Sequence, residues 1–154
     1  MIASCREGEI TQEMRQYIRM CESAKHEIDN ISLSPPNAFY YVRDVGILSD
    51  SGLQELAGRS SAYDKLLKSP NCIFLPGSEY LNENAFLNQK GDFALNDFLS
   101  NDTGLFGYPR GIKPSELFTL NEAGRLAYIM RKQFSKVWDQ GNDSWKTIDQ
   151  ISTS

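Results

Sequence analysis

Near the N-terminus, apolar and polar positions alternate with the period of a helix. From residue 9 to residue 31, apolar side chains recur every three or four positions, which places them on one face of an amphipathic helix. Thr11 precedes this stripe and suits an N-cap, and Pro35 and Pro36 end any helix before them. The stripe consists of Ile10, Met14, Tyr17, Ile18, Cys21, Ala24, Ile28 and Ile31.

Two shorter segments have the composition of strands. Residues 39–48 gather aromatic and β-branched side chains between a Pro-Pro turn and a Ser-Asp-Ser-Gly turn, which predicts a strand or one arm of a hairpin. Residues 71–75 form an apolar run between Pro70 and Pro76, which predicts a short buried strand.

The segment between these strands has a helical pattern. Ser51 and Gln54 have the spacing of a capping box, and the apolar positions that follow predict one helix broken near Gly58 or two short helices. Residues 77–91 are rich in Asn, Gln and Gly, which favours a loop carrying a short helix. Residues 93–99 predict a further short helix or strand.

The clearest pattern lies near the C-terminus. Residues 102–114 are punctuated by Gly and Pro, which favours a loop. Ser115-Glu-Leu-Phe then leads into Thr119-Leu-Asn-Glu122, and Gly141 follows an apolar stripe, so residues 115–141 predict a capped amphipathic helix. The stripe consists of Leu120, Ala123, Ala127, Met130, Phe134, Val137 and Trp138.

These elements predict an α/β or α+β fold in which helices cover a small sheet and a long amphipathic helix lies near the C-terminus. A chain of 154 residues with 40% hydrophobic and 23% charged side chains suits one globular domain, which we place at residues 1–141. Residues 142–154 are then a polar tail that Trp145 tethers to the body of the domain.

The net charge limits the choice of partner. At −4, with a pI near 5.0, the chain lacks the excess of Lys and Arg that dedicated nucleic-acid binders use to neutralise phosphates. The charge is uneven, because residues 105–154 carry seven basic and five acidic side chains, whereas residues 1–104 carry nine and fifteen. We therefore expect another protein as the partner, and the acidic balance favours a basic one.

The sequence favours a cytosolic location without a membrane anchor. No apolar run approaches the length of a membrane span, and no signal-peptide pattern begins the chain. Cys5, Cys21 and Cys72 are odd in number and widely spaced, which suits reduced thiols better than disulfides and gives no zinc-ligand spacing.

Candidate catalytic chemistry is sparse. His26 is the only histidine, so it cannot build a three-histidine metal site, and an exposed structural role is the more common one for such a residue. Cys72 begins an apolar strand, where a buried inert thiol is commoner than a nucleophile. Neither a phosphate-binding loop nor paired carboxylates are evident, so we expect no catalytic residue, metal or cofactor.

The loop at residues 104–114 combines aromatic and basic side chains, the ingredients of a binding surface. The alternative is that its aromatic rings fold back onto the core. The residues that we assign to partner binding are Phe106, Tyr108, Arg110 and Lys113, followed by Tyr80 and Glu79.

The leading hypothesis is therefore a non-enzymatic interaction domain, such as an adaptor, a sensor, or an inhibitor or immunity-type protein. One alternative is an enzyme with a site around Arg43, Asp44 and Glu79, with His26 as a further candidate. A second alternative starts from Leu117-Phe-Thr-Leu-Asn-Glu-Ala-Gly-Arg125, which is similar to the strand-to-helix step after the wing in winged-helix regulators. That resemblance implies salt-sensitive DNA binding through Arg125, Arg131, Lys132 and Lys136.

Overall fold

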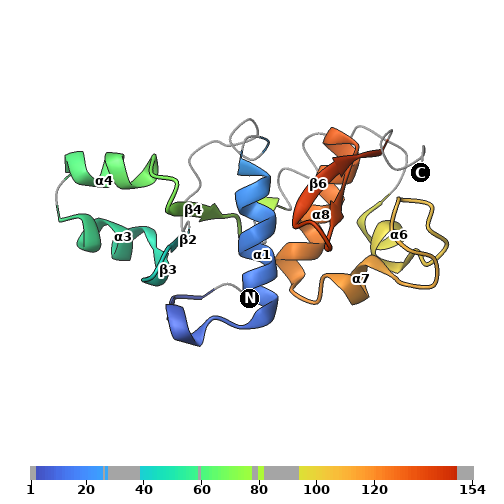
Figure 1. Cartoon of the computed structure of the whole chain (residues 1–154), viewed down its shortest axis with the longest axis horizontal. Coiled ribbons are helices and arrows are strands. Elements are labelled where there is room, and N and C mark those ends of the chain that lie inside the picture. The colour runs from blue at the N-terminus through green and yellow to red at the C-terminus, as the bar shows by residue number, and fades with distance from the viewer. Residues whose placement is uncertain are drawn as a thin grey trace. The chain divides into compact units, whose positions relative to one another are not determined.

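A computed structural model of the chain describes residues 3–25, 27, 39–58, 60–77, 80–81 and 94–148. It combines a four-stranded antiparallel sheet, a two-stranded sheet and helices, which confirms the predicted mixed α/β class (Figure 1). The chain divides into two compact units, Met1–Gly77 and Ser78–Ser154. The single domain expected at residues 1–141 stays a prediction.

The first unit begins with short elements that lead into its longest helix. These are β1 (Cys5–Arg6), the 3-10 helix η1 (Glu7–Glu9) and α1 (Gln12–Ser23). Thr11 is the N-cap of α1, as predicted, and its hydroxyl accepts a hydrogen bond from the N–H of Met14 at 3.2 Å. The predicted continuation of this helix at residues 28–31 lies outside the described residues.

The sheet of the first unit has the strand order β1-β3-β2-β4, with all neighbours antiparallel. Its other strands are β2 (Phe39–Val42), β3 (Gly46–Ser49) and β4 (Cys72–Leu75). β4 confirms the predicted short strand, but residues 39–48 form a hairpin instead of one strand. Arg43 and Asp44 lie in its turn, where Asp44 takes a left-handed φ of 68° that Asp tolerates better than β-branched residues do.

Two short helices follow the hairpin, α3 (Asp50–Ala57) and α4 (Ser60–Leu67). Gly58 ends α3 with a left-handed φ of 75°, which confirms the alternative with two helices. The N-cap of α3 is Ser49, not the predicted Ser51, because the Ser49 hydroxyl accepts from the N–H of Gly52 at 3.2 Å. The Tyr63 hydroxyl donates to the Asp50 carboxylate and so links the two helices.

Burial of apolar side chains between these helices and the sheet forms the core of the first unit. α1 and α4 both contact β4, and α3 contacts β2 and β3. Leu53 is fully buried and packs with Val42 and Cys72. Tyr17 is also fully buried, and its hydroxyl donates to the carbonyl of Pro76 at 2.5 Å, which satisfies its polar group.

The second unit contains three helices and a hairpin among its described residues. They are α6 (Leu95–Ser100), α7 (Pro114–Leu117), α8 (Asn121–Phe134), β5 (Lys136–Asp139) and β6 (Ser144–Thr147). α8 is the predicted long amphipathic helix, and it contacts both α6 and β5 (Figure 1). Its buried face includes Leu126, Ile129 and Met130.

The helix predicted over residues 115–141 is shorter than expected. It is interrupted after α7, and α8 begins after Leu120, which makes no side-chain capping bond. α8 ends at Ser135, whose left-handed φ of 55° turns the chain into β5. Val137 and Trp138 therefore belong to a strand, although their spacing from Phe134 also fits a helical stripe.

Part of the segment predicted as a polar tail forms the second strand of the hairpin. Residues 144–147 pair antiparallel with residues 136–139, and Trp138 lies opposite Trp145. The two indole rings meet edge to face with their centroids 5.2 Å apart, so Trp145 holds β6 against β5. Residues 149–154 lie outside the described residues.

Candidate functional site

The loop at residues 102–113 is held by two inward-facing aromatic side chains. Phe106 and Tyr108 are 6% and 7% exposed, and both rings contact Phe98 of α6, with centroids 5.5 and 5.9 Å away. The guanidinium of Arg131 lies 5.8 Å from the Phe106 ring centroid, and its Nε donates to the Phe106 carbonyl at 3.2 Å. In this conformation both rings support the loop from beneath and present little surface to a partner.

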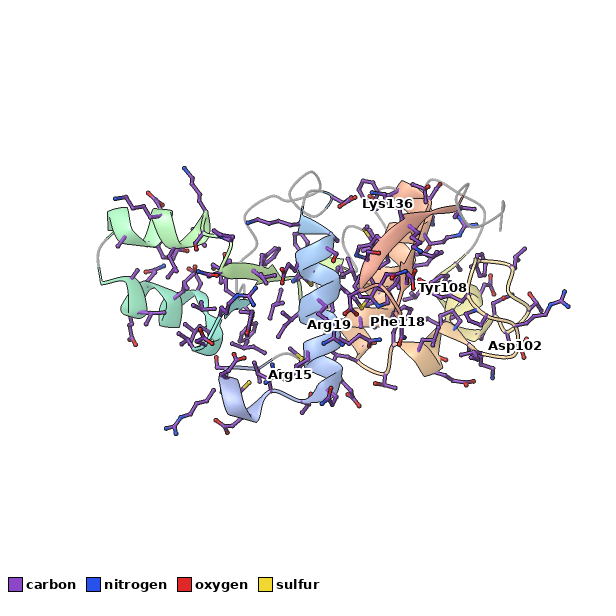
Figure 2. All side chains as sticks on the ribbon, in the orientation of Figure 1. Arg15, Arg19, Asp102, Tyr108, Phe118 and Lys136 are labelled. Atoms are coloured by element: carbon purple, nitrogen blue, oxygen red, sulfur yellow. The ribbon has the colours of Figure 1, made fainter. Side chains whose placement is uncertain are left out.

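Tyr108 also connects the loop to the hairpin. Its ring meets that of Phe118 edge to face, with the ring centroids 5.6 Å apart (Figure 2). Its hydroxyl oxygen accepts a hydrogen bond from the backbone N–H of Trp138 at 3.2 Å. Burial raises the pKa of Tyr108, so its hydroxyl stays neutral at physiological pH. Because the backbone N–H of Trp138 points to Tyr108, it points away from β6. Trp138 and Trp145 therefore form a non-hydrogen-bonded pair of the antiparallel ladder, in which the two side chains lie close together.

Gly107 lets the loop approach the hairpin closely. Its φ of 100° is one that residues with a side chain rarely adopt, and a Cβ built on it would lie 2.9 Å from Cγ1 of Val137. Backbone hydrogen bonds brace the loop further, from Gly107 N to Gly104 O at 3.1 Å and from Gly111 N to Asp102 O at 2.7 Å. The loop therefore has a defined shape, set by its own hydrogen bonds together with its contacts to α6, α8 and β5.

The outer side of the loop carries apolar and basic groups. Leu105 is 69% exposed and Ile112 is 36% exposed. Arg110 and Lys113, both assigned to partner binding from the sequence, are exposed as well. Within the described residues neither forms a salt bridge, although the Nε of Arg110 approaches the carbonyl of Thr103 at 3.4 Å.

A pocket of about 490 Å³ opens beside this loop, entirely within the second unit. One wall comes from the loop and α7, and the other comes from β5, the following turn and β6. Its lining is Gly107, Tyr108, Pro109, Leu117, Val137, Trp138, Asp139, Gln140, Gly141 and Lys146. Its volume is in the range of ligand pockets, which are mostly apolar with a few polar groups.

Asp139 and Lys146 supply the charged groups of the pocket lining. Their carboxylate and ammonium groups are 2.6 Å apart, and the carboxylate also accepts from Asn142 at 2.8 Å and from the N–H of Gly141 at 3.0 Å. Hydrogen bonds from Lys146 and Asn142 lower the pKa of Asp139 to about 2. Asp139 is therefore an anion across the physiological range, with its main acceptor positions engaged.

The remaining residues expected at a binding or catalytic site lie elsewhere or are not described. Tyr80 is half-buried and, like residue 81, has a helical conformation, whereas Glu79 and His26 lie outside the described residues. Arg43 is 3.7 Å from the Glu22 carboxylate, and Asp44 is exposed in the β2–β3 turn. Arg43 therefore pairs with a carboxylate of α1, while Glu79, the third residue of that candidate site, is not among the described residues.

The basic residues of α8 that the DNA-binding alternative would use make contacts within the protein. Arg131 binds the Phe106 carbonyl, and Lys132 donates to the Tyr128 hydroxyl at 2.8 Å. Arg125 donates to the side chain of Asn121. Lys136 is half-buried in β5.

The buried thiols are poor nucleophiles. Burial raises the pKa of Cys72 to about 11 and raises that of Cys21 further, so both stay protonated at neutral pH. The part of the chain that the structure describes holds no cluster of three or more His, Cys, Asp or Glu side chains suited to a metal ion. None of its helices combines the length and apolarity that crossing a membrane requires.

Comparison with known proteins gives no relative, since no family model, curated protein or solved structure matches this chain. The local geometry alone therefore has to suggest a function.

Sequence reasoning found the loop but missed the pocket beside it. The missed lining residues include Leu117, Trp138, Asp139 and Lys146. A signal was present in the alternating Val137-Trp-Asp and Ser144-Trp-Lys-Thr segments on either side of Gly141-Asn142, which is the pattern of a hairpin. The competing helical spacing of Val137 and Trp138 obscured it.

Proposed function

We propose that this chain is a non-enzymatic, cytosolic protein-interaction domain that binds its partner through the outer side of the 102–113 loop. The observation that carries the proposal is the exposure of Leu105 and Ile112 on a loop whose inner side is anchored by Phe106 and Tyr108. A pre-shaped loop loses little conformational freedom on binding, so burial of these side chains can contribute to affinity. Reduced thiols in the described residues suit the cytosol.

The basic groups of the loop suit a role in partner recognition. Arg110 and Lys113 flank the exposed Ile112, and Arg is enriched among residues that dominate protein interfaces. In this proposal, Phe106 and Tyr108 act indirectly by holding the loop, whereas Arg110 and Lys113 contact the partner. Adaptors and inhibitors or immunity-type proteins act in this way, and the acidic remainder of the chain leaves a basic partner compatible.

The test compares two pairs of exposed apolar residues. The loop pair is Leu105→Asp with Ile112→Asp, and the matched control is Val45→Asp with Leu56→Asp, which are exposed by 39% and 49% in the first unit. Proteins captured from a lysate of the source cells by the wild-type chain are identified by mass spectrometry, purified, and their affinities measured by calorimetry. We expect the loop pair to weaken binding by about 100-fold or more, since two buried aliphatic side chains contribute about 1.5 kcal/mol or more each.

The control pair should retain the wild-type affinity. Equal binding by both double variants and the wild-type chain, with the fold verified by circular dichroism, would refute a role for the loop. Turnover of a substrate by the pure wild-type chain would argue for the enzymatic alternative.

A further inference from the structure

The pocket beside the loop has the features of a pre-formed ligand site. Tyr108 is fixed by its ring contact with Phe118 and by its hydrogen bond from Trp138 N. The opposite wall is fixed by the hydrogen bonds that Asp139 accepts from the hairpin turn and from Lys146. A site whose walls are already held in place binds without a large ordering cost.

The apolar part of the pocket suits one large side chain. Tyr108, Leu117 and Val137 supply aromatic and aliphatic surface, and Trp138 also lines the pocket. Burying a Phe-sized group against such surface contributes about 1.5–3 kcal/mol. A volume of about 490 Å³ leaves room for the group and for the backbone that carries it.

The two charged groups of the pocket lining leave more hydrogen-bond donors than acceptors unused. The Asp139 carboxylate already accepts from Gly141, Asn142 and Lys146. The Lys146 ammonium has three N–H donors, and one of them is engaged by Asp139. Two donors of Lys146 therefore face no described acceptor, and a carboxylate is the group that would satisfy them best.

The charged residues next to the lining residues in the sequence balance one another. Arg110 directly follows Pro109, which lines the pocket, while Glu116 directly precedes the lining residue Leu117. Asp102, the first residue of the loop, lies apart from Tyr108 (Figure 2). Asp139 balances the charge of Lys146, so the preference for a carboxylate depends on the two remaining donors of Lys146.

We propose that this pocket receives an aromatic or aliphatic side chain from an acidic segment of the protein partner, with a neighbouring carboxylate of that segment bound to Lys146. This rests on the proposed function and adds the chemistry of the partner segment. A partner of overall basic charge is compatible with it, because only the inserted segment has to be acidic.

The hairpin supplies its own reporter for a test with the full chain. Trp138 lines the pocket, and the ring of Trp145 contacts the ring of Trp138. Because these are the two tryptophans of the protein, intrinsic fluorescence reports on pocket occupancy. Three N-acetylated, C-amidated tripeptides serve as probes: Glu-Phe-Glu, Glu-Ser-Glu and Lys-Phe-Lys. We expect Glu-Phe-Glu to bind at least about tenfold more tightly than either of the others, because Glu-Ser-Glu lacks the phenyl group and Lys-Phe-Lys has the opposite charge.

Variants at position 146 separate binding from structural support. Lys146→Met should weaken Glu-Phe-Glu binding by about tenfold, as expected for a lost charge-assisted hydrogen bond, and Lys146→Arg should preserve it. Lys65→Met, which removes an exposed charge in the first unit, is the matched control and should have no effect. If Lys146→Met perturbs the hairpin, as judged by near-ultraviolet circular dichroism, the order in which the wild-type chain binds the three probes still decides the matter.

The outcomes of the two tests can be told apart. Equal binding of all three probes, tighter binding of Lys-Phe-Lys, or no binding of Glu-Phe-Glu would overturn the pocket proposal. If the Leu105 and Ile112 double variant still loses the partner in that case, the proposed function stands without this ligand. If Glu-Phe-Glu binds as expected while that double variant keeps its partner, the pocket binds an acidic segment but the loop surface is not the interface.

Discussion

At the scale of single residues, Tyr108 and Asp139 show how each wall of the candidate site is held in place. Tyr108 is buried among Phe98 and Phe118, and its hydroxyl accepts from the backbone of β5. Asp139 makes three polar contacts with the turn and with β6. Tyr108 uses both its ring and its hydroxyl, and Asp139 makes several polar contacts, so that neither wall depends on a single interaction.

A first prediction concerns Gly107, where a side chain would meet both backbone strain and Val137. Gly111 is the matched control, because it has a φ of 83° but no atom within 4 Å of the point where a Cβ would lie. We expect Gly111→Ala to lower the free energy of unfolding by about 1–2 kcal/mol, and Gly107→Ala to lower it by a further 1–3 kcal/mol, roughly the cost of overpacking. Urea denaturation followed by tryptophan fluorescence measures both, and equal losses would mean that the loop does not approach Val137 closely.

A second prediction concerns the pH dependence of the hairpin. The folded pKa of Asp139, about 2, lies below its ordinary value of 3.8, so its carboxylate stabilises the folded state above about pH 4. That contribution is lost as the pH falls towards 2. The stability difference between the wild-type chain and Asp139→Asn should therefore shrink over this window, measured by urea denaturation at successive pH values.

Asp97→Asn provides the control for the pH experiment. Asp97 is an exposed acid of α6, so its replacement controls for the loss of one negative charge from the second unit. A difference between the wild-type chain and Asp139→Asn that stays constant from pH 5 to pH 2 would contradict the role assigned to the Lys146 and Asn142 contacts.

At the scale of elements, the junction between α8 and β5 decides where the hairpin and its pocket can form. Phe134, Val137 and Trp138 fit a helical stripe, yet the chain leaves the helix at Ser135 through a left-handed residue. Ser is not the residue that most favours this conformation, because its Cβ crowds the following carbonyl. The pairing of β5 with β6 and the contact between Trp138 and Trp145 stabilise the strand instead.

A third prediction follows for this junction. Ser135→Gly should raise the free energy of unfolding by about 0.5–1 kcal/mol, because relief of the left-handed strain exceeds the added entropy of the unfolded chain. Gly58→Ala is the reverse change at the end of α3, with a φ of 75° and no neighbour within 4 Å, and it should lower stability by about 1 kcal/mol. Thermal denaturation measures both, and a destabilising Ser135→Gly would show that the serine side chain has a role of its own.

Elements fixed by local chemistry could be predicted from the sequence, whereas the end of α8 could not. Thr11, Gly58 and the apolar run at residues 72–75 act through local chemistry, and the structure confirms the cap, the helix break and the strand. The end of α8 is set by pairing with residues 144–147, which is not a local property. Local pattern alone therefore did not decide between the hairpin, which forms one wall of the pocket, and a continued helix.

The loop shows a similar limit for the candidate site. Gly and Pro residues mark residues 102–114 as a loop, and its aromatic content suggested binding. Composition does not say which side chains point inward, and the partners of Phe106 and Tyr108 come from α6, α8 and β5. The exposed apolar residues are instead Leu105 and Ile112, whose types alone gave no reason to single them out.

At the scale of the whole molecule, the chain consists of two compact units, each with buried side chains of its own. The aromatic residues are divided in a useful way, because Trp138 and Trp145 both belong to the second unit. Tryptophan fluorescence therefore follows the unfolding of that unit, whereas far-ultraviolet circular dichroism follows the helices of both.

This division allows a fourth prediction, on whether the units unfold separately. Leu53 is fully buried in the first unit, and Leu126 is fully buried in the second. Each change to Ala should cost about 2–5 kcal/mol in the unit that contains it. We expect Leu53→Ala to lower the urea concentration at which the circular dichroism signal begins to change, while the midpoint of the tryptophan fluorescence transition stays in place. Leu126→Ala should lower the midpoint of the fluorescence transition. If Leu53→Ala instead shifts both signals by the same amount, the two units unfold as one cooperative structure, and the single domain predicted from the sequence is the better description.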